Sequence, residues 1–252
     1  MSAAAEARIG RVSPPSIDSS LAATLLPTVL SLIAGSVDTI SFLGLGGLFT
    51  AHVTGNLVIL AAHLVAGDAA PIAAMLSVPV FMVALALARL LAGALEAIGL
   101  ASLLPLLLLQ LLLLAGFLIL AISAGPHIDP DAANLILAGM LGVSAMAVQN
   151  ALVQISLTNT PTTAVMTTNV THFVLDLGGV LGGSDPAEVA KARDRAMHTL
   201  PVIVGFTIGG GLGAACQAAA GLWSLALPTG LALLALAMGL AVKPRDRASA
   251  AP

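Results

Sequence analysis

Residues 103–120 read LLPLLLLQLLLLAGFLIL, a run in which Gln110 is the sole polar side chain. With its flanks, the apolar stretch covers residues 102–123 and carries no charge. A helix rises about 1.5 Å per residue, so a stretch of this length can cross a hydrocarbon core about 30 Å thick. Residues 102–123 therefore predict a transmembrane helix and set the expected fold class, an all-α membrane protein.

The rest of the chain repeats this pattern. Five further apolar runs of similar length cover residues 21–48, 71–95, 132–157, 197–219 and 222–242. The chain is 58% hydrophobic and 8% charged, whereas a soluble domain carries about 25% charged residues. Its net charge of -3 gives no reason to expect a nucleic-acid partner. We therefore expect a polytopic helical protein whose principal partner is the lipid bilayer.

The expected organisation is a single membrane domain over residues 21–242. A polar tail, residues 1–20, precedes it and is expected to be disordered, and a basic tail, residues 243–252, follows it. No hydrophilic segment is long enough for a soluble catalytic domain, and no phosphate-binding, zinc-protease or serine-hydrolase motif occurs. The single cysteine, Cys216, excludes an intramolecular disulfide and a thiolate metal cluster. We expect no enzyme activity, cofactor or metal.

Two segments depart from the spanning pattern. Residues 49–66 open with FTAHVTGN, here called the first break (residues 49–56), and residues 161–181 open with PTTAVMTTN, the second break (residues 161–169). The apolar stretch between Asn56 and Gly67 has ten residues, or about 15 Å of helix, half the hydrocarbon core. The chain then has six full spans and two half-membrane helices, or eight spans if both segments cross.

The basic residues favour six spans, because cytoplasmic loops are enriched in Lys and Arg. Arg and Lys gather near the N-terminus, in residues 183–196 and in the C-terminal tail, whereas residues 124–131 contain acidic residues and no Lys or Arg. Six spans leave every basic cluster inside and the acidic loop outside. Eight spans move the acidic loop inside. Both termini are expected to be cytoplasmic in either case.

The two breaks resemble each other at an offset of 113 residues: Ala51, Thr54 and Asn56 are matched by Ala164, Thr167 and Asn169. The chain could therefore be a duplication with half-repeats at residues 21–123 and 132–242. Three spans per half would invert the second repeat, and four would keep the repeats parallel. Interrupted hydrophobic segments at matching positions point to a binding site in secondary transporters.

The stretch from residue 34 to residue 60 reads AGSVDTISFLGLGGLFTAHVTGNLVIL. Its G-S-V-D, L-F-T-A-H and T-G-N elements, within residues 35–57, resemble the YoaK-type family of uncharacterised bacterial inner-membrane proteins. The resemblance extends over the chain in length and span pattern. It implies a multi-pass protein of the bacterial inner (plasma) membrane, and it supplies no substrate, reaction or catalytic residue.

Asp38 is a candidate for function because a carboxylate inside an apolar span costs about several kcal/mol and usually faces protein or a water-filled cavity. It could hold a proton, a cation or a polar substrate, or it could be a structural acceptor for His52 or Thr54. The Thr54-Gly55-Asn56 turn could cap the half-helix that follows it. Alternatively, the free N–H groups at that helix start could bind a ligand.

Polar pairs on other spans are further candidates. Gln149 and Asn150 could bind a solute or join helices. His172 and Asp176 are four residues apart and therefore share a helix face. They could relay protons, or they could form a structural pair. Gly205, Gly209 and Gly213 are a small-residue stripe typical of close helix packing.

We therefore predict a secondary transporter or permease for a small polar solute, with its site near midmembrane at the paired breaks, and proton coupling could run through Asp38. The candidate binding residues are Asp38, His52, Thr54, Gly55, Asn56, Gln149, Asn150, Thr167 and Asn169, and the candidate proton relay is Asp38, His172 and Asp176. The alternative is a non-transporting membrane scaffold or accessory subunit. Either protein could form a homo-oligomer.

Overall fold

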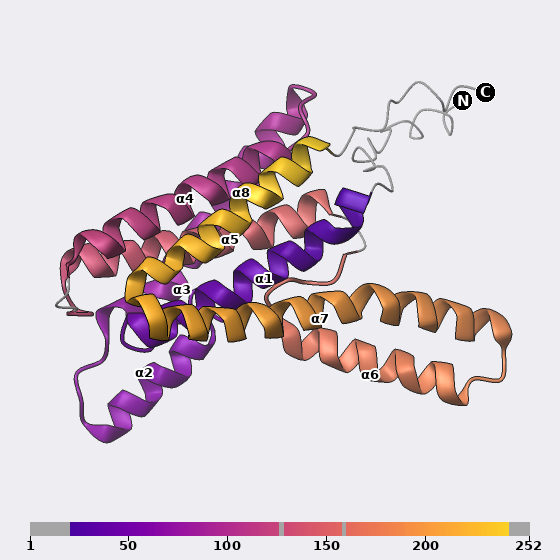
Figure 1. Ribbon diagram of the computed structural model, residues 1–252, viewed down its shortest axis with the longest axis horizontal. Coiled ribbons are helices and arrows are strands. Elements are labelled where there is room, and N and C mark those ends of the chain that lie inside the picture. Colours follow the sequence, from indigo (N-terminus) through magenta and orange to yellow (C-terminus); the bar gives the residue numbers. More distant parts are fainter. Residues whose placement is uncertain (1–20, 126–128, 158–159, 242–252) are drawn as a thin grey trace, which may run out of the picture.

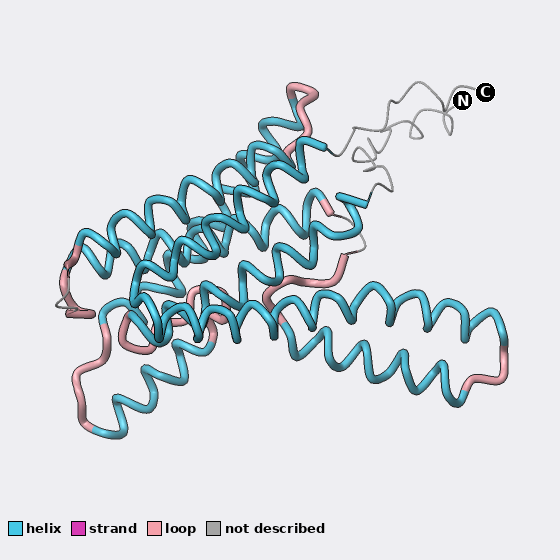
Figure 2. Tube along the Cα trace, in the orientation of Figure 1, coloured by secondary structure: helices cyan, strands magenta, loops and turns pink. Residues whose placement is uncertain are grey.

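The computed structural model describes residues 21–125, 129–157 and 160–241 (Figures 1 and 2). The predicted tails, residues 1–20 and 243–252, lie outside this range. The described part is helical and contains no strand, which confirms the all-α expectation. Its helices are α1 (Leu21–Gly44), α2 (Gly55–Ala66), α3 (Ile72–Ala97), α4 (Leu103–Ser123), α5 (Ala133–Ser156), α6 (Met166–Gly182), α7 (Pro186–Ala220), the 3-10 helix η1 (Gly221–Leu225) and α8 (Ala226–Ala241).

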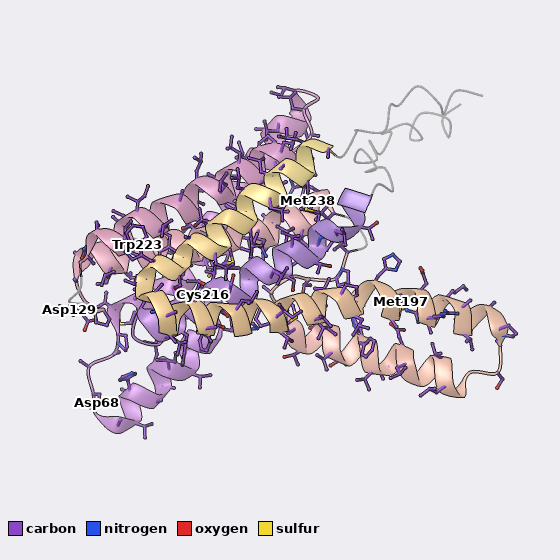
Figure 3. All side chains as sticks on the ribbon, viewed as in Figure 1. Asp68, Asp129, Met197, Cys216, Trp223 and Met238 are labelled. Carbon is purple, nitrogen blue, oxygen red and sulfur yellow. The ribbon has the colours of Figure 1, made fainter. Side chains whose placement is uncertain are left out.

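Five segments of the described chain are long and apolar enough to cross a membrane. They are Thr24–Gly44, Ile72–Ala97, Leu103–Ser123, Ala133–Ser156 and Pro186–Ala241, the last of which holds α7, η1 and α8. Large apolar side chains also project outward along the helices (Figure 3). On α3, Met82, Val83, Leu87 and Leu90 are each at least 60% exposed. Lipid is the environment that such a surface fits.

The start of α7 corrects the predicted span at residues 197–219. The helix begins at Pro186, so most of residues 183–196, predicted as a loop, are helical. Asp185 is the N-cap and its Oδ1 accepts the Ala187 N–H at 3.0 Å, with Pro186 in the first turn. Both features stabilise a helix start. With 35 residues, α7 is about 52 Å long, longer than a hydrocarbon core is thick.

The helices α1 and α5 form the centre of the bundle, and each packs against helices from the other half of the chain. α1 packs against α7 and α8, α5 packs against α3 and α4, and α4 packs against α8. α6 runs back along α7, and Figure 1 shows this pair projecting from the bundle. α2 leaves the bundle at the other end and packs against α3.

The glycine stripe on α7 packs directly on the α1 backbone, as its spacing predicts. A Cβ at Gly209 would lie 2.3 Å from the Leu32 carbonyl oxygen, and one at Gly213 would lie 2.8 Å from that of Ser36. The Ser31 hydroxyl donates to the Val202 carbonyl oxygen at 2.6 Å across the same interface. This packing holds α7 against the helix that carries Asp38.

Candidate functional site

Asp38 lies in the last turns of α1, and its carboxylate is 4% exposed. Its Oδ1 accepts the backbone N–H groups of Thr50 at 2.8 Å and Ala51 at 2.7 Å. Its Oδ2 lies 3.2 Å from the His52 backbone nitrogen and 2.6 Å from His52 Nδ1. The carboxylate thus satisfies the backbone donors of the first break, which would otherwise be buried without partners.

His52 extends this contact toward α7. Its Nδ1 is engaged by Asp38, while its side chain remains 37% exposed. Its ring lies edge-on to Phe206 of α7, with the centroids 5.3 Å apart. The His52 ring therefore connects the Asp38 carboxylate, the first break and α7, and its exposed part is open to a proton or a polar ligand.

Asn56 closes the first break. Its side chain is fully buried: Oδ1 accepts the Phe49 N–H at 2.9 Å, and Nδ2 donates to the Phe49 carbonyl oxygen and to Ser77 Oγ, both at 2.8 Å. Thr54 occupies the N-cap position of α2 but makes no side-chain cap bond, so its expected capping role is wrong. Gly55 is required by space, because a Cβ there would lie 2.9 Å from the Phe49 ring.

Gln149 joins α5 to three other parts of the chain. Its Nε2 donates to Thr163 Oγ1 in the second break at 2.8 Å and to the Leu30 carbonyl oxygen of α1 at 2.9 Å. Its Oε1 accepts Gln110 Nε2 at 2.7 Å. Gln110 is missing from the sequence-based candidates, although it is the lone polar residue in the run that decides the fold.

Asn169 repeats one contact of Asn56. Its Nδ2 donates to the Thr162 carbonyl oxygen at 2.6 Å, so both asparagines bond the carbonyl seven residues earlier. Thr167 lies in the first turn of α6, whose N-cap position is Val165 rather than Thr167.

Asn150 bonds within its own helix. Its Nδ2 donates to the Met146 carbonyl oxygen at 2.9 Å. Of the predicted amide pair, Gln149 is thus the residue that bonds a break.

An open cavity of about 720 Å³ lies beside the second break, and we call it the polar pocket. Residues from the end of α5, the second break, α6 and the first half of α7 line it, including Thr162, Asn169, His172, Asp176, Asp194 and Arg195. Its volume is in the range of small-molecule sites, which is about 300–1,000 Å³.

An ion pair forms one wall of the polar pocket. Arg195 Nε and Nη2 donate to Asp176 Oδ1 at 2.9 and 2.6 Å. His172 lines the pocket on the same face of α6 as Asp176, yet the charged partner of Asp176 is Arg195 from the facing helix. The sequence spacing placed His172 and Asp176 on one face of the helix, as the structure has them. It did not indicate Arg195 as the partner of Asp176, because residues 183–196 were expected to be a loop.

The predicted site residues therefore form separate groups. Asp38, His52 and Asn56 organise the first break, Gln149 connects the helices near the second break, and Asn169, His172 and Asp176 line the polar pocket. Besides Gln110, the charged and imidazole side chains of the polar pocket that sequence reasoning missed are Asp194, Arg195 and His198, all from the first half of α7. The Asp185-Pro186 pair is the local signal that could have extended α7 to include them.

Comparisons with known proteins place the chain in a family and go no further. No curated protein and no solved structure matches it. Residues 26–238 match the model of a family described as a protein of unknown function, DUF1275. An uncharacterised family is what the motif of residues 35–57 predicts, and the match includes both breaks and the polar pocket. The chain is a polytopic helical protein, compatible with a membrane protein, and it belongs to the DUF1275 family, whose function is unknown.

Proposed function

We propose that this protein is a secondary permease for a small polar solute and that the polar pocket is its solute site. The observation that carries the proposal is the pocket itself, which brings charged and neutral polar side chains from four chain segments around one open cavity. A concave site in which several polar side chains converge is the usual form of a small-molecule site. An interrupted segment, the second break, forms part of its lining, as in transporter sites.

An inverted repeat of three spans and one half-helix is part of the proposal. The contacts between helices support it: α1 packs against α7 and α8 as α5 packs against α3 and α4, and α2 packs against α3 as α6 packs against α7. The helices α1, α2 and α3 begin 112, 111 and 114 residues before α5, α6 and α7, close to the offset of 113 residues between the breaks, and α4 begins 123 residues before α8. The matching bonds of Asn56 and Asn169 support the same relation.

Six spans also agree with the ends of the bundle. Asp68 after α2, Asp129 before α5 and Trp223 in η1 lie toward the same end of the molecule (Figure 3). Six spans put all three outside, whereas eight spans put Asp68 and Asp129 on the opposite side from Trp223. The basic residues of α7 would then face the cytoplasm, as would both termini, in a bacterial inner membrane.

Proton coupling through Asp38 and His52 completes the proposal. The Asp38 carboxyl group accepts the N–H groups that shape the first break. Protonation of Asp38 would remove negative charge from this acceptor and weaken those hydrogen bonds, which are strongest with a charged partner. Since His52 also contacts Phe206, a change at the first break would be transmitted to α7, which forms a wall of the polar pocket.

Uptake by proteoliposomes that contain the purified protein tests this function. We expect uptake of a small polar solute that empty liposomes lack, and its loss in Asp38→Asn while the protein remains folded. Asn150→Ala is the matched control, because Asn150 bonds only within its helix. Uptake by Asp38→Asn equal to that of the unaltered protein would remove Asp38 from the mechanism, and no uptake of any solute from a broad library would reject the permease.

A membrane scaffold or accessory subunit is the second candidate. The observation that favours it is the saturation of the first break, where Asp38 and Asn56 satisfy backbone groups of their own chain. A scaffold would lose stability in Asn56→Ala with no change in any solute-dependent signal. A permease would also show a solute-dependent shift in melting temperature, and variants of the polar pocket would abolish it.

A further inference from the structure

The charges around the polar pocket give it a preference among solutes. Its lining carries two carboxylates, Asp176 and Asp194, and one guanidinium, Arg195, together with the imidazoles of His172 and His198. With both imidazoles neutral, the lining has a net charge of -1. A pocket lined by an excess of one sign of charge attracts ions of the opposite sign, so this pocket favours a cation over an anion.

Arg195 is already engaged, which further disfavours an anion. Both of its hydrogen bonds reach Oδ1 of Asp176, and among the described residues no donor reaches Oδ2. Because Asp176 partly neutralises the guanidinium, the N–H donors that remain on Arg195 attract an anion less strongly than those of an unpaired arginine would. A cation can instead approach Asp176 Oδ2 with the ion pair intact.

Asp194 supplies a second acceptor. Its side chain is 76% exposed, and the nearest imidazole nitrogen, His198 Nδ1, lies 3.6 Å from its Oδ1. That nitrogen bonds the Asp194 carbonyl oxygen at 2.7 Å instead. The Thr168 hydroxyl adds a neutral acceptor from α6. A primary ammonium has three donors and no acceptor, which matches two carboxylates and a hydroxyl.

We infer that the polar pocket binds a solute that carries a protonated primary amine, a substrate class that rests on the proposed permease function. Asp176 and Asp194 are the carboxylates available to the ammonium in this cavity, and Leu175 and Pro161, which also line it, are available to the carbon skeleton. An organic amine fits better than a metal ion, because the described residues include no group of three or more metal-ligating side chains.

Calorimetric titration of the full-length protein in phosphatidylcholine nanodiscs tests the inference. Ethanolamine and glycolate are similar in size and opposite in charge, and we expect ethanolamine to bind at least tenfold more tightly. Asp194 is exposed, so Asp194→Asn should lower ethanolamine affinity about twofold to fivefold, the range for an exposed charge pair. Asp176→Asn should free Arg195 and shift the preference toward glycolate. Glu188→Gln is the matched control, since Glu188 is on α7, outside the pocket, and pairs with Lys191 at 2.8 Å.

The ammonium could come from a free amine or from a lipid head group. Nanodiscs that contain phosphatidylethanolamine separate the two: unchanged ethanolamine affinity supports a free amine, and competition supports the head group. Glycolate binding more tightly than ethanolamine to the unaltered protein would overturn the inference, as would ethanolamine affinity equal in both Asp variants and the control. Uptake is read separately, so intact ethanolamine binding without uptake rejects only the permease, and uptake without this binding rejects only the ammonium site.

Discussion

Replacement of Gly209 by alanine tests the packing of α7 on α1. The added Cβ would lie 2.3 Å from the Leu32 carbonyl oxygen and 2.9 Å from the Leu32 Cα. Both are backbone atoms, so no side chain can rotate away. An ordinary contact is at least 3.4 Å, so α7 must move away from α1 by about 1 Å to relieve the clash. Overpacking of this kind typically costs about 1–3 kcal/mol.

Two further effects set the net magnitude. The same movement weakens the hydrogen bond from Ser31 to Val202, 2.6 Å long and worth about 0.5–1.5 kcal/mol. Alanine in place of glycine stabilises a helix by about 0.5–1 kcal/mol. Together these effects predict a loss of about 0.5–4 kcal/mol in unfolding free energy for Gly209→Ala.

Gly211→Ala is the matched control two residues away. A Cβ at Gly211 would meet no atom within 4 Å, so this variant keeps only the gain in helix propensity, about 0.5–1 kcal/mol. Thermal unfolding in detergent micelles, followed by circular dichroism, measures both variants. We expect Gly209→Ala to melt several degrees lower and Gly211→Ala slightly higher than the unaltered protein. Equal melting temperatures for the two variants would refute the close contact between α1 and α7.

Three other substitutions test the polar contacts by the same melting assay. Gln149→Ala leaves Gln110 Nε2 and Thr163 Oγ1 buried without their partner and should lower the unfolding free energy by about 1–3 kcal/mol. Asn150→Ala, the control, should lower it by under about 1 kcal/mol. Equal losses in the two variants would argue against the Gln149 network. Asn56→Ala removes three buried hydrogen bonds and should cost at least about 2 kcal/mol, so unchanged melting would mean that Asn56 does not hold the first break. Lys191→Ala breaks a surface ion pair whose side chains are 65% and 64% exposed and should change stability by at most about 0.5 kcal/mol; a larger loss would show that this part of α7 is packed against something in solution.

The fold was largely predictable because the length of an apolar run is a local property. The run at residues 103–120 became α4 (Leu103–Ser123), and the other runs became helices with similar bounds. The start of α7 was missed because hydropathy alone treats residues 186–196 as a loop. Their helix depends on the Asp185 cap and on packing against α6.

The candidate site was less predictable, because a partner across the fold cannot be recognised from a single segment. Asp38 and Asn56 stood out since a polar group in an apolar segment must find a partner. The sequence did not specify that Asp38 accepts the N–H groups of Thr50 and Ala51. The bond between Asp176 and Arg195 joins two helices across a turn, so helix periodicity within α6 directs attention to His172 instead.

In the proposed topology both breaks turn the chain back within the membrane, which leaves six spans and places the polar pocket on the cytoplasmic side. Cysteine labelling of intact cells with a membrane-impermeant maleimide tests it most directly, in a Cys216→Ser background that removes the single native cysteine. Asp68→Cys and Asp129→Cys should both be labelled in intact cells, and Lys191→Cys only after permeabilisation. Labelling of the Asp68 and Asp129 variants only after permeabilisation would mean that α2 crosses the membrane. If the Lys191 variant is also labelled only after permeabilisation, α6 must cross as well, and either result would contradict six spans.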